Sequence, residues 1–352
     1  MSGGNTAFRE NKMKLGIIGV SGAGKKTIFE ALTKNTAGAG HSGEAQIGTI
    51  PVPDERVDIL SRMYNPRKTI YAQVEYFLPG RKSAKNDPHV WNEIRDCDAL
   101  IHVVRNFKGF GTEDPKPGAD ILELDQEMIF ADLVVVEKRL ERIELDKKRG
   151  KKLNPEEHSL LQRCLEYLNQ EKPLRNDPEL SGAQALRGFA FVSAKPVLVL
   201  YNNDDENPDI PDSNALTETD HYLVIRGKLE LELSQMTKEE AEEFLAEFHI
   251  TASAMDRVIK KSYEILGLIS FFTVGEDEVR AWTIKSRTEA VDSAEVIHSD
   301  IKKGFIRAEV VAYNDLMDAG SYPEAKKKGT VRLEGKTYIV QDGDIINFRF
   351  NV

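Results

Sequence analysis

One stretch near the start of the chain, Lys14 to Thr27, limits what the sequence can fold into. It reads KLGIIGVSGAGKKT, in which an apolar run over residues 15–20 predicts a buried strand and the glycines predict a tight turn. The residues that follow, 27–34, are amphipathic and predict a helix. A strand, a glycine-rich turn and a helix in this order can hold a phosphate group, so we expect an α/β fold with an anion site at the turn.

The turn matches the phosphate-binding pattern G-x-x-x-x-G-K through Gly19, Gly24 and Lys25. Glycines let the backbone curl so that several N–H groups point at one anion, and the N-terminus of the next helix adds positive potential. The eighth position of the pattern is normally a Ser or Thr that holds Mg²⁺, and here it is Lys26. A glycine-rich turn in an ordinary α/β fold is the alternative interpretation. The residues expected to contact phosphate are Gly22, Ala23, Gly24, Lys25, Lys26 and Thr27.

Composition narrows the class of protein. The chain has 352 residues, enough for two or three domains of about 100–200 residues each. It is 40% hydrophobic and 30% charged, no apolar run approaches the roughly 18 residues of a membrane span, and residues 1–12 contain no signal-peptide core. The net charge of −10 disfavours a general nucleic-acid coat, and Cys97 and Cys164 lack metal-ligand spacing. We therefore expect a cytoplasmic protein with reduced cysteines, no bound metal, no membrane contact and no DNA partner, with residues 1–12 outside the fold.

Alternating strand and helix patterns follow the phosphate loop and predict a mostly parallel sheet. Asp54 has the residue type of a helix N-cap, and residues 91–98 predict a short helix. His102 lies in a continuous apolar run, where a histidine is more often a core residue than a catalytic one. Strands are expected over residues 70–80, 99–105, 196–201 and 221–226.

Residues 123–170 break this alternation with two long amphipathic helical patterns. Apolar residues recur three and four positions apart on each side of GKKLNP, residues 150–155, which predicts an antiparallel helical hairpin inserted into the α/β domain. Its basic tip either meets RNA or is simply solvated. The tip residues are Lys147, Lys148, Arg149, Lys151 and Lys152.

From Ile269 onward the sequence predicts a small α+β module of four or five short strands and one helix. Glu334-Gly335 and Asp342-Gly343 are turn signals between strands. The aromatic residues Trp282, Phe305 and Phe348 are expected in the core. Two interpretations of the basic residues of this module remain open. They contact RNA or the ribosome, or they are solvated side chains of a module that docks on the α/β domain. They are Lys302, Lys303, Arg307, Lys326, Lys327 and Lys328.

Five further stretches of the chain are informative: FFTVGEDEVRAWTIKSRTEAVDSAEVIHSDIKKGFIRAEVVAY, RLEGKTYIVQDGDIINFRFNV, IGTIPVPDERVDIL, VEKRLERI and IRDCDALIHVVRNF. Through them, nearly the whole chain from Lys14 resembles the YchF / Obg-like ATPase family of P-loop proteins. The resemblance implies an α/β P-loop NTPase (G-domain) fold, an inserted coiled-coil arm and a C-terminal TGS-like β-grasp domain. It also implies ribosome association and binding of ATP in preference to GTP. The implied boundaries are 13–125 and 176–268 for the G domain, 126–175 for the arm and 269–352 for the TGS-like domain.

The resemblance also places a base-recognition motif. The family has Asn-x-x-Glu where GTPases have Asn-Lys-x-Asp, and the matching positions here are Asn202 and Asp205. Asp205 is one methylene shorter than the family's Glu, which weakens the implied adenine preference. Gly227 falls where the family places a small-residue loop beside the base.

The positions that the family uses for Mg²⁺ differ in this chain. Lys26 replaces the hydroxyl residue of the phosphate loop, and Leu78 stands nearest to the acid of the second-switch motif Asp-x-Ala-Gly-Leu, here Phe77–Gly80. Ser42 is the only hydroxyl near the usual threonine of the first switch. Phosphoryl transfer depends on neutralisation of charge by Mg²⁺. We therefore expect nucleotide binding with little need of Mg²⁺, through the cation of Lys26, and slow hydrolysis or none.

Three functions remain open from the sequence. The first is an ATP-binding, weak or inactive ATPase that acts as a switch at the ribosome. The second is an RNA- or ribosome-binding adaptor whose G-like domain is only a scaffold. The third is an active ATPase in which other residues replace the missing metal ligands.

Overall fold

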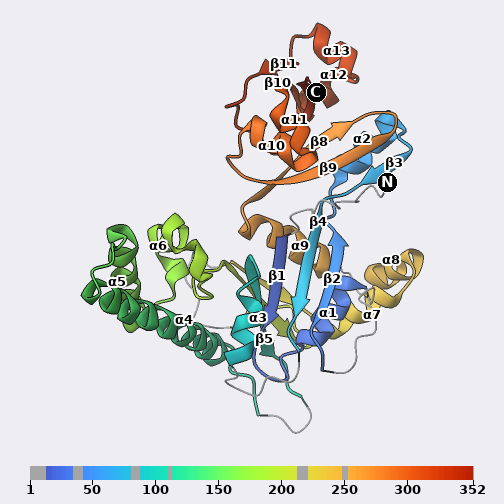
Figure 1. Ribbon diagram of the computed structural model, residues 1–352. Helices are drawn as coiled ribbons and strands as arrows, with labels where there is room; N and C mark the ends of the chain where they lie inside the picture. The colour runs from blue at the N-terminus through green and yellow to red at the C-terminus, as the bar shows by residue number, and fades with distance from the viewer. Residues whose placement is uncertain are drawn as a thin grey trace, which may run out of the picture. The chain divides into compact units, whose positions relative to one another are not determined.

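The computed structural model describes residues 13–34, 43–80, 88–109, 113–211, 221–247 and 253–351 (Figure 1). The chain divides into two compact units. The larger unit contains Lys14–Thr49 and Glu75–Val258, and the smaller unit contains Ile50–Val74 and Ile259–Val352. Each unit is a folded body with its own sheet. No helix among the described residues is long and apolar enough to span a membrane.

The larger unit is built on a six-stranded sheet with the order β2-β4-β1-β5-β6-β7. Strands β1, β5, β6 and β7 run parallel, with Ile17 paired to Ile101 and Ile101 paired to Leu198. The central strand β5 is buried over its first six residues, as expected for a parallel strand covered on both faces. The predicted α/β fold is therefore confirmed. The strands are β1 (Met13–Ile18), β2 (Gln46–Pro51), β4 (Gln73–Leu78), β5 (Ala99–Asn106), β6 (Val197–Asn203) and β7 (His221–Ile225).

Helices connect these strands. The first, α1, begins at Lys25, so both lysines of the phosphate loop belong to its first turn. The start of α8 has the capping box that Thr237 and Glu240 predict, since each backbone N–H donates to the other's side chain. The larger unit contains the helices α1 (Lys25–Thr33), α3 (Pro88–Ile94), α7 (Gly227–Gln235) and α8 (Lys238–Glu247), and α9 (Ala254–Ile265) has residues in both units.

The predicted helical hairpin is confirmed by α4 (Pro117–Lys148) and α5 (Pro155–Asn169), which Figure 1 shows side by side. Helix α4 begins about six residues before the expected start at 123, because Pro117 at its first position suits a helix N-terminus. Buried Asp132 fixes the hairpin by accepting N–H bonds from Val192 and Ser193. Short helices follow at η1 (Leu174–Asn176), α6 (Pro178–Gly182) and η2 (Gln184–Phe189).

The smaller unit contains a second six-stranded sheet, with the order β11-β10-β12-β8-β9-β3. Phe305 and Phe348 are buried in its core and Trp282 packs against them, as the sequence predicts. The expectation of one helix is wrong, because over residues 268–351, all of which are described, four short helices cross between strands. The elements are β8 (Leu268–Val274), β9 (Glu278–Lys285), α10 (Ala290–Ile297), α11 (Ser299–Lys303), β10 (Phe305–Ala312), α12 (Tyr313–Ala319), α13 (Tyr322–Lys327), β11 (Arg332–Glu334) and β12 (Asp344–Phe350).

A segment from early in the chain completes the smaller unit, a relation that the sequence-based boundaries do not include. The expected strand over residues 70–80 is β4, and only its first residue, Ile70, belongs to β3 (Lys68–Ile70), which pairs in parallel with β9 in the other sheet. Helix α2 (Glu55–Tyr64) packs against β8 and β9. Its predicted N-cap is confirmed, since the side chain of Asp54 accepts from the N–H of Arg56.

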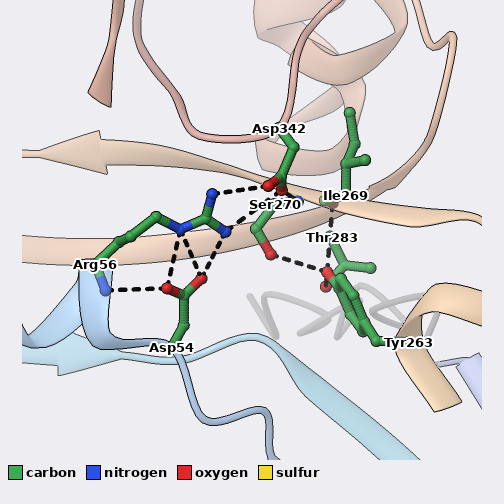
Figure 2. A network of polar contacts seen from close by, with 7 residues as sticks. All are labelled: Asp54, Arg56, Tyr263, Ile269, Ser270, Thr283 and Asp342. Carbon is green, nitrogen blue, oxygen red and sulfur yellow. Dashed lines mark hydrogen bonds and ion pairs between the residues drawn. The ribbon is translucent and has the colours of Figure 1, made fainter. Parts of the chain in front are cut away.

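Arg56 ties this segment to the C-terminal strands (Figure 2). Its guanidinium pairs with Asp54 at 2.8 Å and with Asp342 at 2.7 Å. Asp342 also accepts the backbone N–H of Ser270, so the two carboxylates and the cation form one network. Burial opposes the charge, yet the hydrogen bonds to both carboxylates raise the pKa of Arg56 above its usual value.

Candidate functional site

The loop between β1 and α1 has a backbone that only glycine can form at two places. Gly19 and Gly24 have φ values of 144° and 92°. A Cβ atom at Gly19 would lie 2.3 Å from the carbonyl oxygen of Val103, and one at Gly24 would lie 2.4 Å from the side-chain nitrogen of Asn202. The glycines therefore let the loop turn tightly against β5 and β6.

Lys25 is folded over this loop. Its Nζ donates hydrogen bonds to the carbonyl oxygens of Gly19 at 2.6 Å and Val20 at 2.8 Å. The ammonium group thus lies at the turn, half-buried, where the sequence places a phosphate contact. An anion at the loop would meet this charge together with the N-terminus of α1.

Lys26 lies in the first turn of α1 and is more exposed than Lys25. Its Nζ is 3.3 Å from Glu30, and 58% of the side chain is exposed. An exposed ion pair of this spacing contributes little, so the side chain can exchange this partner for a stronger anion. Thr27 follows in the same turn and is half-buried.

Asn202 connects three parts of the predicted site. Its side-chain nitrogen donates to the carbonyl oxygen of Ala23 at 3.0 Å, and its side-chain oxygen accepts from the N–H of Gly227 at 2.9 Å. The residue is buried at the end of β6. The side chain of Asn202 thus joins the glycine loop to the start of α7.

Asp205 is held by the N-terminal turn of α7. Its carboxylate accepts from the N–H of Leu229 at 3.3 Å and lies 3.8 Å from the Nζ of Lys228. The guanidinium of Arg226 donates to the backbone carbonyl of Asp205 at 3.3 Å. Sequence reasoning did not include Arg226, and no motif points to it. The acid therefore lies near Gly227, but helix α7 already engages its carboxylate.

Two of the positions that the family uses for Mg²⁺ are occupied by Lys26 and Leu78 in this chain. Leu78, which stands nearest to the place of the second-switch acid, is a buried apolar residue at the end of β4. No group of three or more His, Cys, Asp or Glu side chains among the described residues could hold a metal ion. Ser42, the hydroxyl expected in the first switch, lies outside the described residues.

His102 lies in β5, and its exposure is only 1%. Burial, followed by the charges of Arg175 and Lys25, lowers its pKa from 6.5 to about 3. Its Nε2 atom has no hydrogen-bond partner within the described part of the chain. The residue is thus a neutral core histidine, which agrees with the interpretation favoured from the sequence.

The basic residues of the smaller unit mostly have local acidic partners. Lys302 pairs with Asp292 and Glu295, and Lys303 pairs with Asp300. In the hairpin tip of the larger unit, Lys151 pairs with Asp146. Such pairing favours the interpretation of the paired lysines as solvated side chains. The further pairs in the smaller unit are Lys326 with Glu309, Lys327 with Glu324, and Lys328 with the carbonyl oxygen of Asp318.

The sheet order, the glycine loop and the inserted hairpin define the larger unit as a P-loop G-domain fold, followed by a separate C-terminal domain. Residues 268–351 match the family model YchF-GTPase_C, described as a protein of unknown function (DUF933). The chain is 38% identical to the ribosome-binding ATPase YchF of Bacillus subtilis, with 96% of this chain and 99% of that protein covered. The corresponding protein of Pasteurella multocida is 35% identical with the same coverage. This chain belongs to the YchF family.

Solved structures also resemble the chain. The YchF GTPase of Schizosaccharomyces pombe matches with a TM-score of 0.82 and 28% identity, covering 96% of this chain and 98% of that one. A GTP-binding protein from Pyrococcus horikoshii matches with a TM-score of 0.56 and 18% identity, covering 96% and 100%. The second likeness concerns the fold alone.

Proposed function

We propose that this chain binds ATP at the loop of Gly22–Thr27, in preference to GTP, and acts as a ribosome-associated switch in the cytoplasm. Lys25 and Lys26 neutralise the phosphates, so binding needs little Mg²⁺. Hydrolysis is slow or absent. The observation that carries the proposal is the double hydrogen bond of Asn202, which joins the phosphate loop to the start of α7.

The phosphate part of the proposal rests on the geometry of the loop. The Lys25 ammonium lies at the turn, and the glycines hold the backbone close to β5 and β6. The backbone of Gly22 and Gly24 supplies N–H groups, whereas the N–H of Ala23 would have to exchange its bond to the carbonyl oxygen of Val20, at 3.3 Å, for one to the phosphate. The first turn of α1 supplies Lys26 and Thr27.

Mg²⁺ does not fit the residues present. A hydroxyl ligand is replaced by the cation of Lys26, which repels a divalent ion, and the acid of the second switch is replaced by buried Leu78. A cation on Lys26 supplies part of the charge that the metal would supply. It does not bridge two phosphate oxygens as a metal does, and for this reason we propose slow turnover.

Base preference in this proposal comes from Asn202, Asp205 and Gly227. The carboxylate of Asp205 is shared with the N-terminus of α7 and with Lys228, so its contribution to base recognition is small. We therefore propose that ATP is preferred over GTP by only a modest factor.

Ribosome association is proposed from the relatives that are named ribosome-binding ATPases. The basic tip of the hairpin is the first candidate surface, since Lys147, Lys148 and Arg149 are exposed at the end of α4. Basic side chains in such a position suit the phosphate backbone of RNA.

A thermal-shift series tests nucleotide binding. The apparent stability should rise most with ATP, less with GTP and ADP, and by about 2.7 kcal/mol when ATP is present at a hundredfold excess over its Kd. Lys25→Ala should abolish the shift, whereas Lys260→Ala, an exposed lysine of α9, should keep it. No shift with any nucleotide would contradict the proposal and leave a scaffold. Co-sedimentation with ribosomes, with and without ATP, then tests the partner separately.

A further inference from the structure

Arg226 lies beside the residues proposed for base recognition. It directly precedes Gly227 at the start of α7. Ile225, one residue earlier, pairs with Asn202 in the parallel ladder of β6 and β7. The side chain of Arg226 is half-buried, and its Nη1 donates to the backbone carbonyl oxygen of Asp205 at 3.3 Å. The guanidinium is therefore held at the carboxyl ends of these two strands, the edge at which α/β sheets bind ligands.

The backbone around Arg226 is fixed by its neighbours. The carbonyl oxygen of Arg226 accepts the first hydrogen bond of α7, from the N–H of Glu230 at 2.9 Å. The next residue admits no side chain, because a Cβ atom at Gly227 would lie 2.7 Å from both the Oδ1 of Asn202 and the Cδ1 of Ile28. The side chain of Arg226 is therefore a charged donor directly beside a close contact between α7 and the base-motif asparagine.

The acid of the base motif is engaged by α7. The carboxylate of Asp205 accepts from the N–H of Leu229 and lies 3.8 Å from the Nζ of Lys228. The ring N–H and the amino group of guanine are donors and need such an acceptor. Arg226 has five N–H donors, of which the bond to Asp205 occupies one. Donors therefore outweigh acceptors among the side chains at this part of the site.

Given the nucleotide binding proposed above, on which this step rests, we infer that Arg226 determines how strongly the site distinguishes purine bases. A guanidinium N–H donates to the O6 atom of guanine, which is an acceptor. The 6-amino group of adenine is itself a donor and receives no bond from Arg226. Arg226 therefore favours 6-oxopurines, keeps GTP a competitor of ATP and limits the preference for ATP to a modest factor.

Contact with the phosphates accounts for Arg226 less well. The side chain of Asn202 separates the two regions, because its nitrogen donates to Ala23 of the phosphate loop and its oxygen accepts from Gly227. Lys25 belongs to the side of the loop, whereas Arg226 belongs to the side of Gly227. A donor on the side of Gly227 therefore acts on the base.

Isothermal titration of the full chain with ATP, GTP and inosine triphosphate tests the inference. Inosine triphosphate carries O6 but lacks the 2-amino group of guanine, so its comparison with ATP isolates the 6-position and the adjacent ring nitrogen. Arg226→Met removes the donors and keeps much of the length of the side chain. Its Kd for inosine triphosphate and for GTP should rise by about tenfold, because a hydrogen bond from a charged donor is lost. Its Kd for ATP should change by less than about threefold.

Two further variants complete the experiment. Arg187→Met is the matched control, because Arg187 is an exposed arginine of η2, and it should leave all three Kd values unchanged. Arg226→Ala removes the same donors as Arg226→Met and gives a second measurement of the ratio of the Kd for inosine triphosphate to the Kd for ATP. This ratio compares two ligands on one protein, so a loss of folded protein does not imitate the effect.

Two results would overturn the role of Arg226 alone. Equal rises of all three Kd values in both Arg226 variants would show that the residue acts on the phosphates, on stacking or on the fold. Unchanged Kd values in both variants would show that it does not contact the base. In either case the wild type still binds nucleotide, so the proposed function stands. A wild type that binds none of the three nucleotides would contradict the proposed function itself, and the role of Arg226 with it.

Discussion

The side-chain oxygen of Asn202 accepts a hydrogen bond from the N–H of Gly227 at 2.9 Å. The nitrogen of the same amide donates to the carbonyl oxygen of Ala23 at 3.0 Å. One buried side chain thus joins the end of β6 to both the phosphate loop and the first turn of α7. A base bound near Gly227 and a phosphate bound at the loop would therefore lie against elements that this side chain connects.

Replacing Asn202 by Ala should destabilise the protein. Two buried backbone groups, the carbonyl of Ala23 and the N–H of Gly227, would lose their hydrogen-bond partner. We expect the free energy of unfolding to fall by about 1–3 kcal/mol for each group that stays unsatisfied. Urea denaturation of the full chain measures the loss. Asn92→Ala, at an exposed position of α3, should leave the midpoint unchanged. Equal midpoints for the two variants would show that the Asn202 bonds are not important for stability.

Replacing Lys26 by Thr should make ATP binding depend on Mg²⁺. The variant restores the hydroxyl of the usual phosphate loop and removes the cation, so without Mg²⁺ its affinity should fall by about tenfold. Adding Mg²⁺ should recover part of the loss. Lys26→Met is the control, since it removes the charge without adding a hydroxyl, and its affinity should fall equally in both conditions. An unchanged affinity in both variants would exclude Lys26 from the site.

Replacing Arg56 by Met should destabilise the smaller unit. Asp54 and Asp342 would then face each other without the cation between them, and we expect a loss of about 1–3 kcal/mol. The fluorescence of Trp282, in a Trp91→Phe background, reports unfolding of this unit during urea titration. Arg67→Met is the control, because Arg67 and its partner Asp277 are 83% and 86% exposed. It should have little effect. Similar losses for both variants would contradict the role of the Arg56 network.

His102 should make the protein less stable in acid. Its pKa is about 3 in the folded chain, below the 6.5 of an unperturbed histidine, so the unfolded chain binds a proton between these pH values while the folded chain does not. The contribution of neutral His102 to the free energy of unfolding is present in full above pH 6.5. It is lost as the pH falls toward 3, by up to about 1.4 kcal/mol per pH unit. The free energy of unfolding of His102→Leu should therefore rise relative to that of the wild type as the pH falls below 6.5.

The free energies of unfolding of the two proteins at a series of pH values check this prediction. Their difference at pH 8 reports packing alone, because histidine is neutral there in both states. A difference that stays constant from pH 8 to pH 4.5 would contradict the neutral, buried histidine.

Local features could be predicted from the sequence because their causes are local. Three examples depend on residues only a few positions apart. They are the N-cap of α2 by Asp54, the capping box of Thr237 and Glu240, and the helical hairpin. The pattern of glycines and lysines likewise located the loop, and the position of Asn202 beside it follows the family motif.

Long-range relations could not be predicted in this way. Arg56 and Asp342 are 286 residues apart, and no periodicity connects them. Strand β3 is only the three residues KTI, too short for a periodic pattern, so nothing in the sequence shows that it joins a different sheet from β4. The contact of Asp205 with the N–H of Leu229 was also missed, because a backbone donor leaves no mark in the sequence.

Isothermal titration of the purified chain with ATP, in Mg²⁺ and then in EDTA, tests the central claim most directly. If loop amides, Lys25 and Lys26 hold the phosphates, the two dissociation constants should agree within about threefold. Binding that is seen only with Mg²⁺ would contradict the claim, and the absence of binding in both titrations would leave the P-loop unit as a scaffold.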